Sequence, residues 1–196
     1  MLWLILAVIV WGVVHSIMAS LGFKDSLRRM FGNGFMRMYR LFYNIFSMIS
    51  FVPILYLMTE LPAPNMYQVP MPWNYLMLAG QGISVILLFV AVLQMDILSF
   101  VGLRQLFEEE KTGKLVTEGF YRFMRHPLYT FGLLILWLSP SVTVNSFVIY
   151  IALTIYIFVG AYFEERKLLR EFGQEYAQYQ SVTPMLIPGM KLGGNK

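Results

Sequence analysis

The chain has 196 residues, of which 58% are hydrophobic and only 13% are charged. Soluble domains are usually about half apolar and about one quarter charged, so this composition excludes an ordinary soluble protein and predicts an all-α helical bundle in a membrane. The net charge of +4 does not indicate nucleic-acid binding, because the positions of the basic residues explain it better. The lack of cysteine excludes disulfides, thiolate metal sites and a cysteine nucleophile.

Five stretches of the chain are apolar and about long enough to cross a bilayer. The first lacks the basic start of a signal peptide and is predicted to be a retained helix. We therefore predict one membrane domain over residues 1–196, with its last two spans forming a hairpin. The predicted spans are residues 2–21, 41–58, 76–95, 119–138 and 146–163. Residues 164–196 are predicted to form a cytoplasmic tail that contains a helix.

All fifteen Lys and Arg residues fall in three clusters, at residues 24–40, 104–125 and 166–196. Cytoplasmic loops of membrane proteins carry an excess of these residues. The clusters are therefore predicted to be cytoplasmic and the N-terminus to be outside. This orientation suits a bacterial inner membrane or a comparable membrane.

Two features of the first half bear on function. His15 lies in the first span, where a lone histidine most often bonds a neighbouring helix, with a functional role as the alternative. Residues 22–40 are predicted to form a cytoplasmic loop with an interfacial helical piece. Their Gly32-Asn33-Gly34 does not make a dinucleotide-binding site, because no strand precedes it and the third glycine is missing.

The internal segment before the fourth span holds most of the chemistry. A charge run around Gly113 is predicted to be a solvated surface turn. Further on, Pro127 favours a helix start, because its missing N–H is one that the first turn does not use. Arg125 and His126 then stand at a helix N-terminus, which attracts anionic groups. The alternative is a basic juxtamembrane anchor that only fixes topology.

A second polar group, Glu164 and Glu165, follows the fifth span. The predicted hairpin brings these glutamates close to Arg125 and His126, so the four side chains are expected to share one cytoplasmic pocket. Opposite charges in such a pocket suit a ligand that is polar at several points. The tail over residues 182–188 is predicted to fold back as a cover. The alternative for the glutamates is a plain surface turn paired with nearby Lys or Arg.

Two separated motifs in the second half resemble those of the integral membrane methyltransferases. That superfamily includes the isoprenylcysteine carboxyl methyltransferases and the phospholipid N-methyltransferases. The matching residues are Gly119-x-Tyr121-x-x-x-Arg125-His126-Pro127-x-Tyr129, then Glu164-Glu165, then Phe172-Gly173-x-x-Tyr176-x-x-Tyr179.

More of the chain resembles one branch, the methanethiol S-methyltransferases and their relatives. The residues that carry this likeness are His15-Ser16, Ala19, Lys24, Tyr39-Arg40, Gly102-Leu103-Arg104-Gln105, Phe163-Glu164-Glu165-Arg166 and Pro184-Met185-Leu186-Ile187-Pro188. The resemblance implies methyl transfer from S-adenosylmethionine to a small or lipophilic thiol, with the cofactor bound between the last two helices and the tail.

The same resemblance implies a set of site residues. Those expected to bind the cofactor are Leu115, Val116, Gly119, Tyr121, His126, Pro127, Tyr129, Glu164 and Glu165. The catalytic candidates are Arg104, Arg125 and His15. An arginine would stabilise the acceptor's thiolate, or a histidine (His15 or His126) would take its proton. The sequence leaves this choice open, as it does the methyl acceptor and the oligomeric state.

Two departures weigh against the other branches. The glycine-x-glycine cofactor element of phospholipid N-methyltransferases is missing upstream of Arg125. Residues 159–162 lack the arginine that precedes the paired glutamates in the prenylcysteine branch. Outside the enzymes, a small membrane carrier or assembly factor is the alternative, as is a haem protein with His15 and His126 as ligands.

Overall fold

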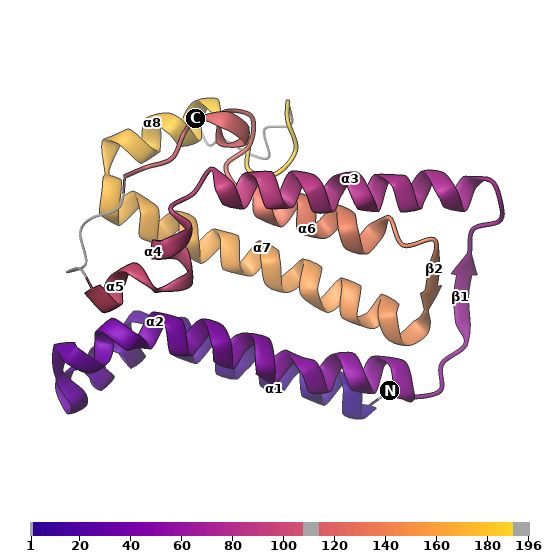
Figure 1. Ribbon diagram of the computed structural model, residues 1–196, viewed down its shortest axis with the longest axis horizontal. Coiled ribbons are helices and arrows are strands. Elements are labelled where there is room, and N and C mark those ends of the chain that lie inside the picture. Colours follow the sequence, from indigo (N-terminus) through magenta and orange to yellow (C-terminus); the bar gives the residue numbers. More distant parts are fainter. Residues whose placement is uncertain (1, 108–113, 190–196) are drawn as a thin grey trace. The chain divides into compact units, whose positions relative to one another are not determined.

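The computed structural model describes residues 2–107 and 114–189 (Figure 1). The predicted surface turn around Gly113 and the end of the tail therefore lie largely outside the described residues. The chain divides into two compact units. Unit 1 consists of Met1–Pro64, Asp96–Thr112 and Thr143–Ile149, and unit 2 consists of Asn65–Met95, Gly113–Val142 and Tyr150–Lys196.

Unit 1 is built on two long helices that pack against each other, α1 (Leu2–Ala19) and α2 (Leu21–Glu60). Ser20 separates them, and its side chain accepts a backbone N–H from the first turn of α2. Farther along, the indole Nε1 of Trp11 donates to Ser50 Oγ at 3.1 Å. A polar pair between apolar helices fixes which faces of the two helices meet.

The basic segment over residues 22–40 lies inside α2, so the predicted loop is helical apart from a kink. Gly32 makes this kink with φ 74° and ψ −179°, a conformation that a residue without Cβ adopts without strain. Two short helices complete the unit, α4 (Ile97–Val101) and α5 (Arg104–Phe107). Asn44 of α2 holds the end of α4, because its Nδ2 donates to the carbonyl oxygens of residues 100 and 101.

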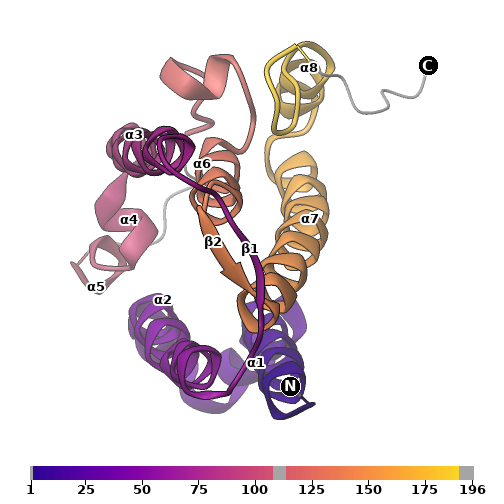
Figure 2. The ribbon, with the colours of Figure 1, turned by 90° about the vertical axis from the view of Figure 1, so that its right-hand side faces the viewer.

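Unit 2 contains three apolar helices and a small sheet. Strand β1 (Asn65–Gln68) pairs with β2 (Ser141–Thr143), the last residue of which belongs to unit 1. Figures 1 and 2 show α3 and α6 side by side. The helices of the unit are α3 (Trp73–Leu93), the 3-10 helix η1 (Gly119–Arg122), α6 (Pro127–Trp137), the larger part of α7 (Val144–Phe172) and α8 (Gln174–Val182).

Polar side chains join the apolar helices of unit 2. From α3, Gln81 Nε2 donates to the carbonyl oxygen of Ile135 at 2.7 Å and to Ser139 Oγ at 3.1 Å. Trp137 Nε1 at the end of α6 donates to Thr154 Oγ1 of α7 at 3.0 Å. Lipid chains offer no hydrogen-bond partners, so bonds of this kind between helices satisfy polar groups that would otherwise have none. They fix α3, α6 and α7 as one packed set.

The prediction of one helix from near Gly119 to residue 138 is wrong. The segment forms η1, then an irregular stretch, and only then α6, which begins at Pro127 as expected. His126 has φ −125° and ψ 65°, because the ring of a following proline disfavours the helical region for the residue before it. The proline that starts α6 therefore also separates α6 from η1.

Four helices of the described chain, α1, α2, α3 and α7, are long and apolar enough to cross a membrane, whereas α6 is shorter. Many of their large apolar side chains face outward; on α3, for example, Leu76 and Ile86 are each 64% exposed. Apolar surface of this kind requires lipid around it. The protein is therefore an integral membrane protein with a helical bundle fold.

Candidate functional site

The tail of the chain holds the turn before α6 through its backbone. The N–H of Arg125 donates to the carbonyl oxygen of Pro184 at 2.9 Å, and the N–H of His126 donates to that of Met185 at 3.1 Å. Thr130 Oγ1 adds a bond to the carbonyl oxygen of Leu186 at 2.8 Å. The tail thus folds back against the start of α6 and fixes the two basic side chains.

Arg125 and Glu165 form a buried ion pair at the centre of the site. Nε and Nη2 of Arg125 both lie 2.6 Å from Glu165 Oε1, and the two side chains are only 10% and 12% exposed. Nη1 of Arg125 donates to the carbonyl oxygens of Gln180 and Thr183. Gln180 Nε2 donates to the other carboxylate oxygen, Oε2, at 2.8 Å. A buried pair is favourable only when its remaining groups are bonded in this way.

His126 lies between the two glutamates. Its Nε2 is 3.2 Å from Glu165 Oε1, while its Nδ1 is 3.7 Å from Glu164 Oε2. The ring of Tyr129 stacks on the imidazole with centroids 5.2 Å apart, and its hydroxyl donates to Glu164 Oε2 at 2.7 Å. Glu164 is 45% exposed although His126 is buried. Of the two carboxylates, Glu164 is therefore the one open to a ligand.

Tyrosines of α8 and η1 adjoin this cluster. Tyr179 OH donates to the carbonyl oxygen of Tyr121. Burial raises the pKa of Tyr179 to about 12 and also raises that of Tyr176, so both hydroxyls keep their protons near neutral pH. The hydroxyls of Tyr121 and Tyr176 are buried, and no described residue hydrogen-bonds to them. Buried hydroxyls without a protein partner indicate an unoccupied bonding capacity that water or a ligand can fill.

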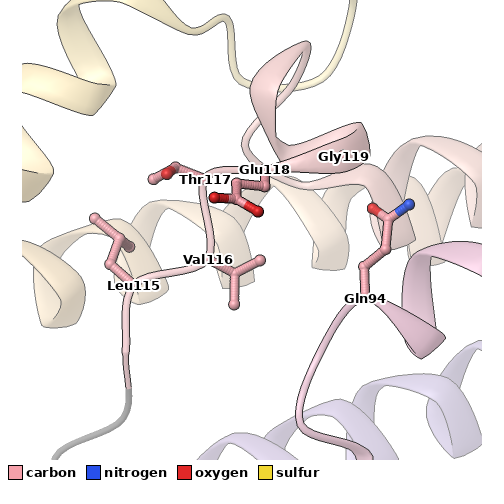
Figure 3. A pocket seen from close by; sticks show the side chains of 6 residues that line it. All are labelled: Gln94, Leu115, Val116, Thr117, Glu118 and Gly119. Atoms are coloured by element: carbon pink, nitrogen blue, oxygen red, sulfur yellow. The ribbon is translucent and has the colours of Figure 1, made fainter.

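A cavity of about 490 Å³ lies beside η1 (Figure 3). Its walls are Gln94, Leu115, Val116, Thr117, Glu118 and Gly119. Gln94 closes one side, since its Oε1 accepts the N–H of Phe120 at 2.8 Å. Gly119 has φ +61°, and a Cβ there would lie 2.4 Å from that oxygen. The backbone conformation therefore favours glycine at this position, and a side chain there would displace the carboxamide of Gln94.

Two of the predicted catalytic residues, His15 and Arg104, belong to unit 1. His15 Nε2 is 2.5 Å from Tyr43 OH, and its Nδ1 is 2.9 Å from Ser47 Oγ, so it bonds the neighbouring helix α2. Arg104 pairs with Asp96. The remaining candidates all lie in unit 2.

The residues predicted for the site therefore fall into two places within unit 2. Leu115, Val116 and Gly119 line the cavity. Around the Arg125–Glu165 pair lie Tyr121, His126, Pro127, Tyr129 and Glu164. The expectation that Arg125, His126, Glu164 and Glu165 come together is confirmed. Among the described residues, no group of three or more acidic or histidine side chains is arranged to hold a metal ion.

Sequence reasoning missed two residues, Gln94 and Gln180. Gln180 follows Tyr176 by four positions, which places both on the same face of α8, and this spacing was a usable signal. Gln94 follows the last residue of α3, and nothing in the local sequence marks it. Its partner is 26 positions away in the chain, so only the fold reveals the contact.

The fold and the charged cluster define a polytopic helical membrane protein with a polar site at one end of unit 2. The chain belongs to the NnrU protein family, which it matches over residues 3–188. No solved structure matches it significantly.

Curated relatives of the chain carry the name methanethiol S-methyltransferase, which confirms the resemblance found in the sequence. One from Crocosphaera subtropica is 34% identical over 59% of this chain and 50% of its own length. A second, from Bradyrhizobium diazoefficiens and named methanethiol S-methyltransferase 2, is 27% identical over 91% and 69%. A third, from Pseudomonas deceptionensis, is 32% identical over 54% and 42%. The chain thus spans about half the length of the first and third.

Proposed function

We propose that this protein is a membrane methyltransferase that uses S-adenosylmethionine to methylate a small or lipophilic thiol. The observation that carries the proposal is the name shared by its relatives, methanethiol S-methyltransferase, together with the Arg125–His126 and Glu164–Glu165 motifs brought into one cluster. When bound, S-adenosylmethionine supplies an already activated methyl group. The protein then has to orient the two reactants and exclude water.

The residues of unit 2 fit the parts of this cofactor. A volume of about 490 Å³ lies within the range of small-ligand pockets, and Leu115 and Val116 offer apolar walls for a flat ring. The half-exposed carboxylate of Glu164 suits an ammonium group. The buried hydroxyls of Tyr121 and Tyr176, without partners among the described residues, can bond further polar groups.

Other side chains of the cluster have a positioning role in this proposal. The Arg125–Glu165 pair already forms several hydrogen bonds within the protein, so its role in this proposal is to hold His126 and the tail in place. His126 and Tyr129 form one wall through their stacked rings. Arg104 and His15 remain proposed residues for handling the thiol, through charge stabilisation or proton transfer.

The proposed orientation places the cluster on the cytoplasmic side of a bacterial inner membrane, with five crossings. Lys and Arg surround the charged site in the sequence, as cytoplasmic segments require. A polar cofactor would then enter from the cytoplasm, while a lipophilic thiol would enter from the bilayer. The chain beyond residue 163 would face the cytoplasm.

The test is methyl transfer from labelled S-adenosylmethionine by the purified protein in detergent. The acceptors are methanethiol, larger thiols, a prenylcysteine and phosphatidylethanolamine. We expect the label only in a thioether, and we expect His126→Ala to abolish transfer while the protein stays folded. Label in the prenylcysteine ester or in the lipid would show that the methyl acceptor is not a thiol but belongs to another chemical class. Absence of both transfer and cofactor binding would leave a carrier or assembly role.

A further inference from the structure

Gln94 is the one polar side chain that closes the cavity from a different part of the chain. It follows α3, whereas the other lining residues are the consecutive residues 115–119, which lead into η1 (Figure 3). It is half-buried, and its Oε1 is fixed by the N–H of Phe120 at 2.8 Å. No described residue accepts a hydrogen bond from its Nε2. The carboxamide is thus held through Oε1, while Nε2 is available to donate a hydrogen bond.

The backbone bond also sets the orientation of the amide. Turning the carboxamide over would place its NH2 group against the N–H of Phe120, and two donors cannot bond each other. A carbonyl oxygen has two lone pairs, so Oε1 can accept one further hydrogen bond. Gln94 therefore keeps one donor, Nε2, and one remaining acceptor site on Oε1 that no described residue uses.

We propose that Gln94 recognises the adenine ring of the cofactor. A glutamine amide matches the N6 amino group and the N7 atom of adenine with two hydrogen bonds. Leu115 and Val116 line the same cavity and supply the apolar surface against which a purine packs. This inference rests on the proposed function, because it assigns one part of the proposed cofactor to one residue.

The orientation of the amide also predicts selectivity. Hypoxanthine carries an oxygen at position 6 in place of the amino group, so Oε1 of Gln94 would meet a second acceptor. The amide cannot turn to relieve this contact without losing the bond from Phe120. A site built around such a polar group rejects the mismatched analogue strongly, because buried groups are left without partners.

The experiment measures binding by calorimetry, with the full chain in detergent, of S-adenosylhomocysteine and S-inosylhomocysteine. We expect the wild type to prefer the adenosyl compound by roughly ten- to a hundredfold. In Gln94→Glu the carboxylate still accepts the N–H of Phe120, but the donor is lost. We expect this variant to keep its unfolding temperature and to bind both compounds about tenfold more weakly, because it loses the donor to N7 that they share. It should keep the preference for the adenosyl compound, because an acceptor oxygen still faces position 6.

A matched control is Gln174→Glu, which adds the same charge at an exposed position of α8 and should bind like the wild type. The inference is overturned if Gln94→Glu keeps the wild-type affinity for S-adenosylhomocysteine, or if the wild type does not distinguish the two compounds. In either case binding of S-adenosylhomocysteine would leave the proposed function standing. If the wild type binds neither compound, the proposed cofactor fails together with this inference.

Discussion

Glu165 is the residue on which most contacts of the charged cluster depend. Its carboxylate accepts hydrogen bonds from Arg125 and Gln180 and lies within hydrogen-bonding distance of His126 Nε2. Glu164, its neighbour in sequence, has only one hydrogen bond to a described residue, from Tyr129. Adjacent residues of one helix point in different directions, so two glutamates with the same local sequence context have different roles. One holds the site together, and the other is open to a ligand.

Replacement of Glu165 by alanine is expected to destabilise the protein. It leaves the guanidinium of Arg125 nearly buried without its carboxylate, and breaking such a pair costs about 3–5 kcal/mol. The unfolding temperature in detergent, followed by circular dichroism, should fall clearly. Glu171→Gln, at an exposed position of the same helix, is the control and should unfold as the wild type does. An unchanged unfolding temperature for Glu165→Ala would show that the pair does not stabilise the fold.

At the scale of elements, α8 is tied to η1 by one hydrogen bond between Tyr179 and the carbonyl oxygen of Tyr121. We expect Tyr179→Phe to lower the free energy of unfolding by about 1 kcal/mol near pH 8, since the mutant keeps the ring but loses the bond. Chemical unfolding of the two proteins, measured at the same pH, gives this difference directly.

The same pair of proteins also tests the effect of pH. Burial raises the pKa of Tyr179 from 10.0 to about 12, so its contribution to stability is fully present below pH 10 and is lost as the pH rises through about 12. The advantage of the wild type over Tyr179→Phe should therefore shrink between these values. The comparison cancels the other tyrosines, which both proteins share. An advantage that stays constant to pH 12 would contradict the raised pKa.

The elements that the sequence predicted best are those with a strong local signal. The length of the apolar stretches predicted the spans, and four of the five coincide with long apolar helices. Pro127 correctly predicted the start of α6. The error in the fourth predicted span has a physical cause: the helix was expected to run from near Gly119 to residue 138, but the proline at 127 keeps the residue before it out of the helical region and separates α6 from η1. Hydrophobicity does not report such breaks.

The contacts that sequence could not predict are those between distant elements. Motif order was enough to expect Arg125 near Glu165, because a hairpin joins their helices. The contact of Gln94 with Phe120, by contrast, depends on how α3 ends relative to η1. The sequence also did not predict the kink at Gly32 within α2. Glycine is common in membrane helices as well as in loops, so its presence alone does not indicate a kink.

At the scale of the molecule, contacts at the two ends of unit 2 bear on how often the chain crosses the membrane. Pairing of β1 with β2 places residues 65–68 and 141–143 on the same side. The bond between Arg125 and Glu165 places the start of α6 beside the polar end of α7. If α7, which is long enough to cross, spans the membrane, these two ends of unit 2 lie on opposite sides. The segment from residue 127 to 140 would then also have to pass between them, although α6 itself has only 11 residues.

This crossing can be tested with single cysteines, because the natural chain contains none. Asn65→Cys and Gln174→Cys change exposed positions of β1 and α8. If α3, α6 and α7 each cross, three passages separate these positions, and the two cysteines lie on opposite sides. A membrane-impermeant maleimide added to spheroplasts should then label Asn65→Cys at once and Gln174→Cys only after permeabilisation, with the wild type as the unlabelled control. Labelling of both from outside would mean that α6 does not cross. The reverse pattern would keep all three passages but invert the proposed orientation, and would place the charged cluster outside the cytoplasm.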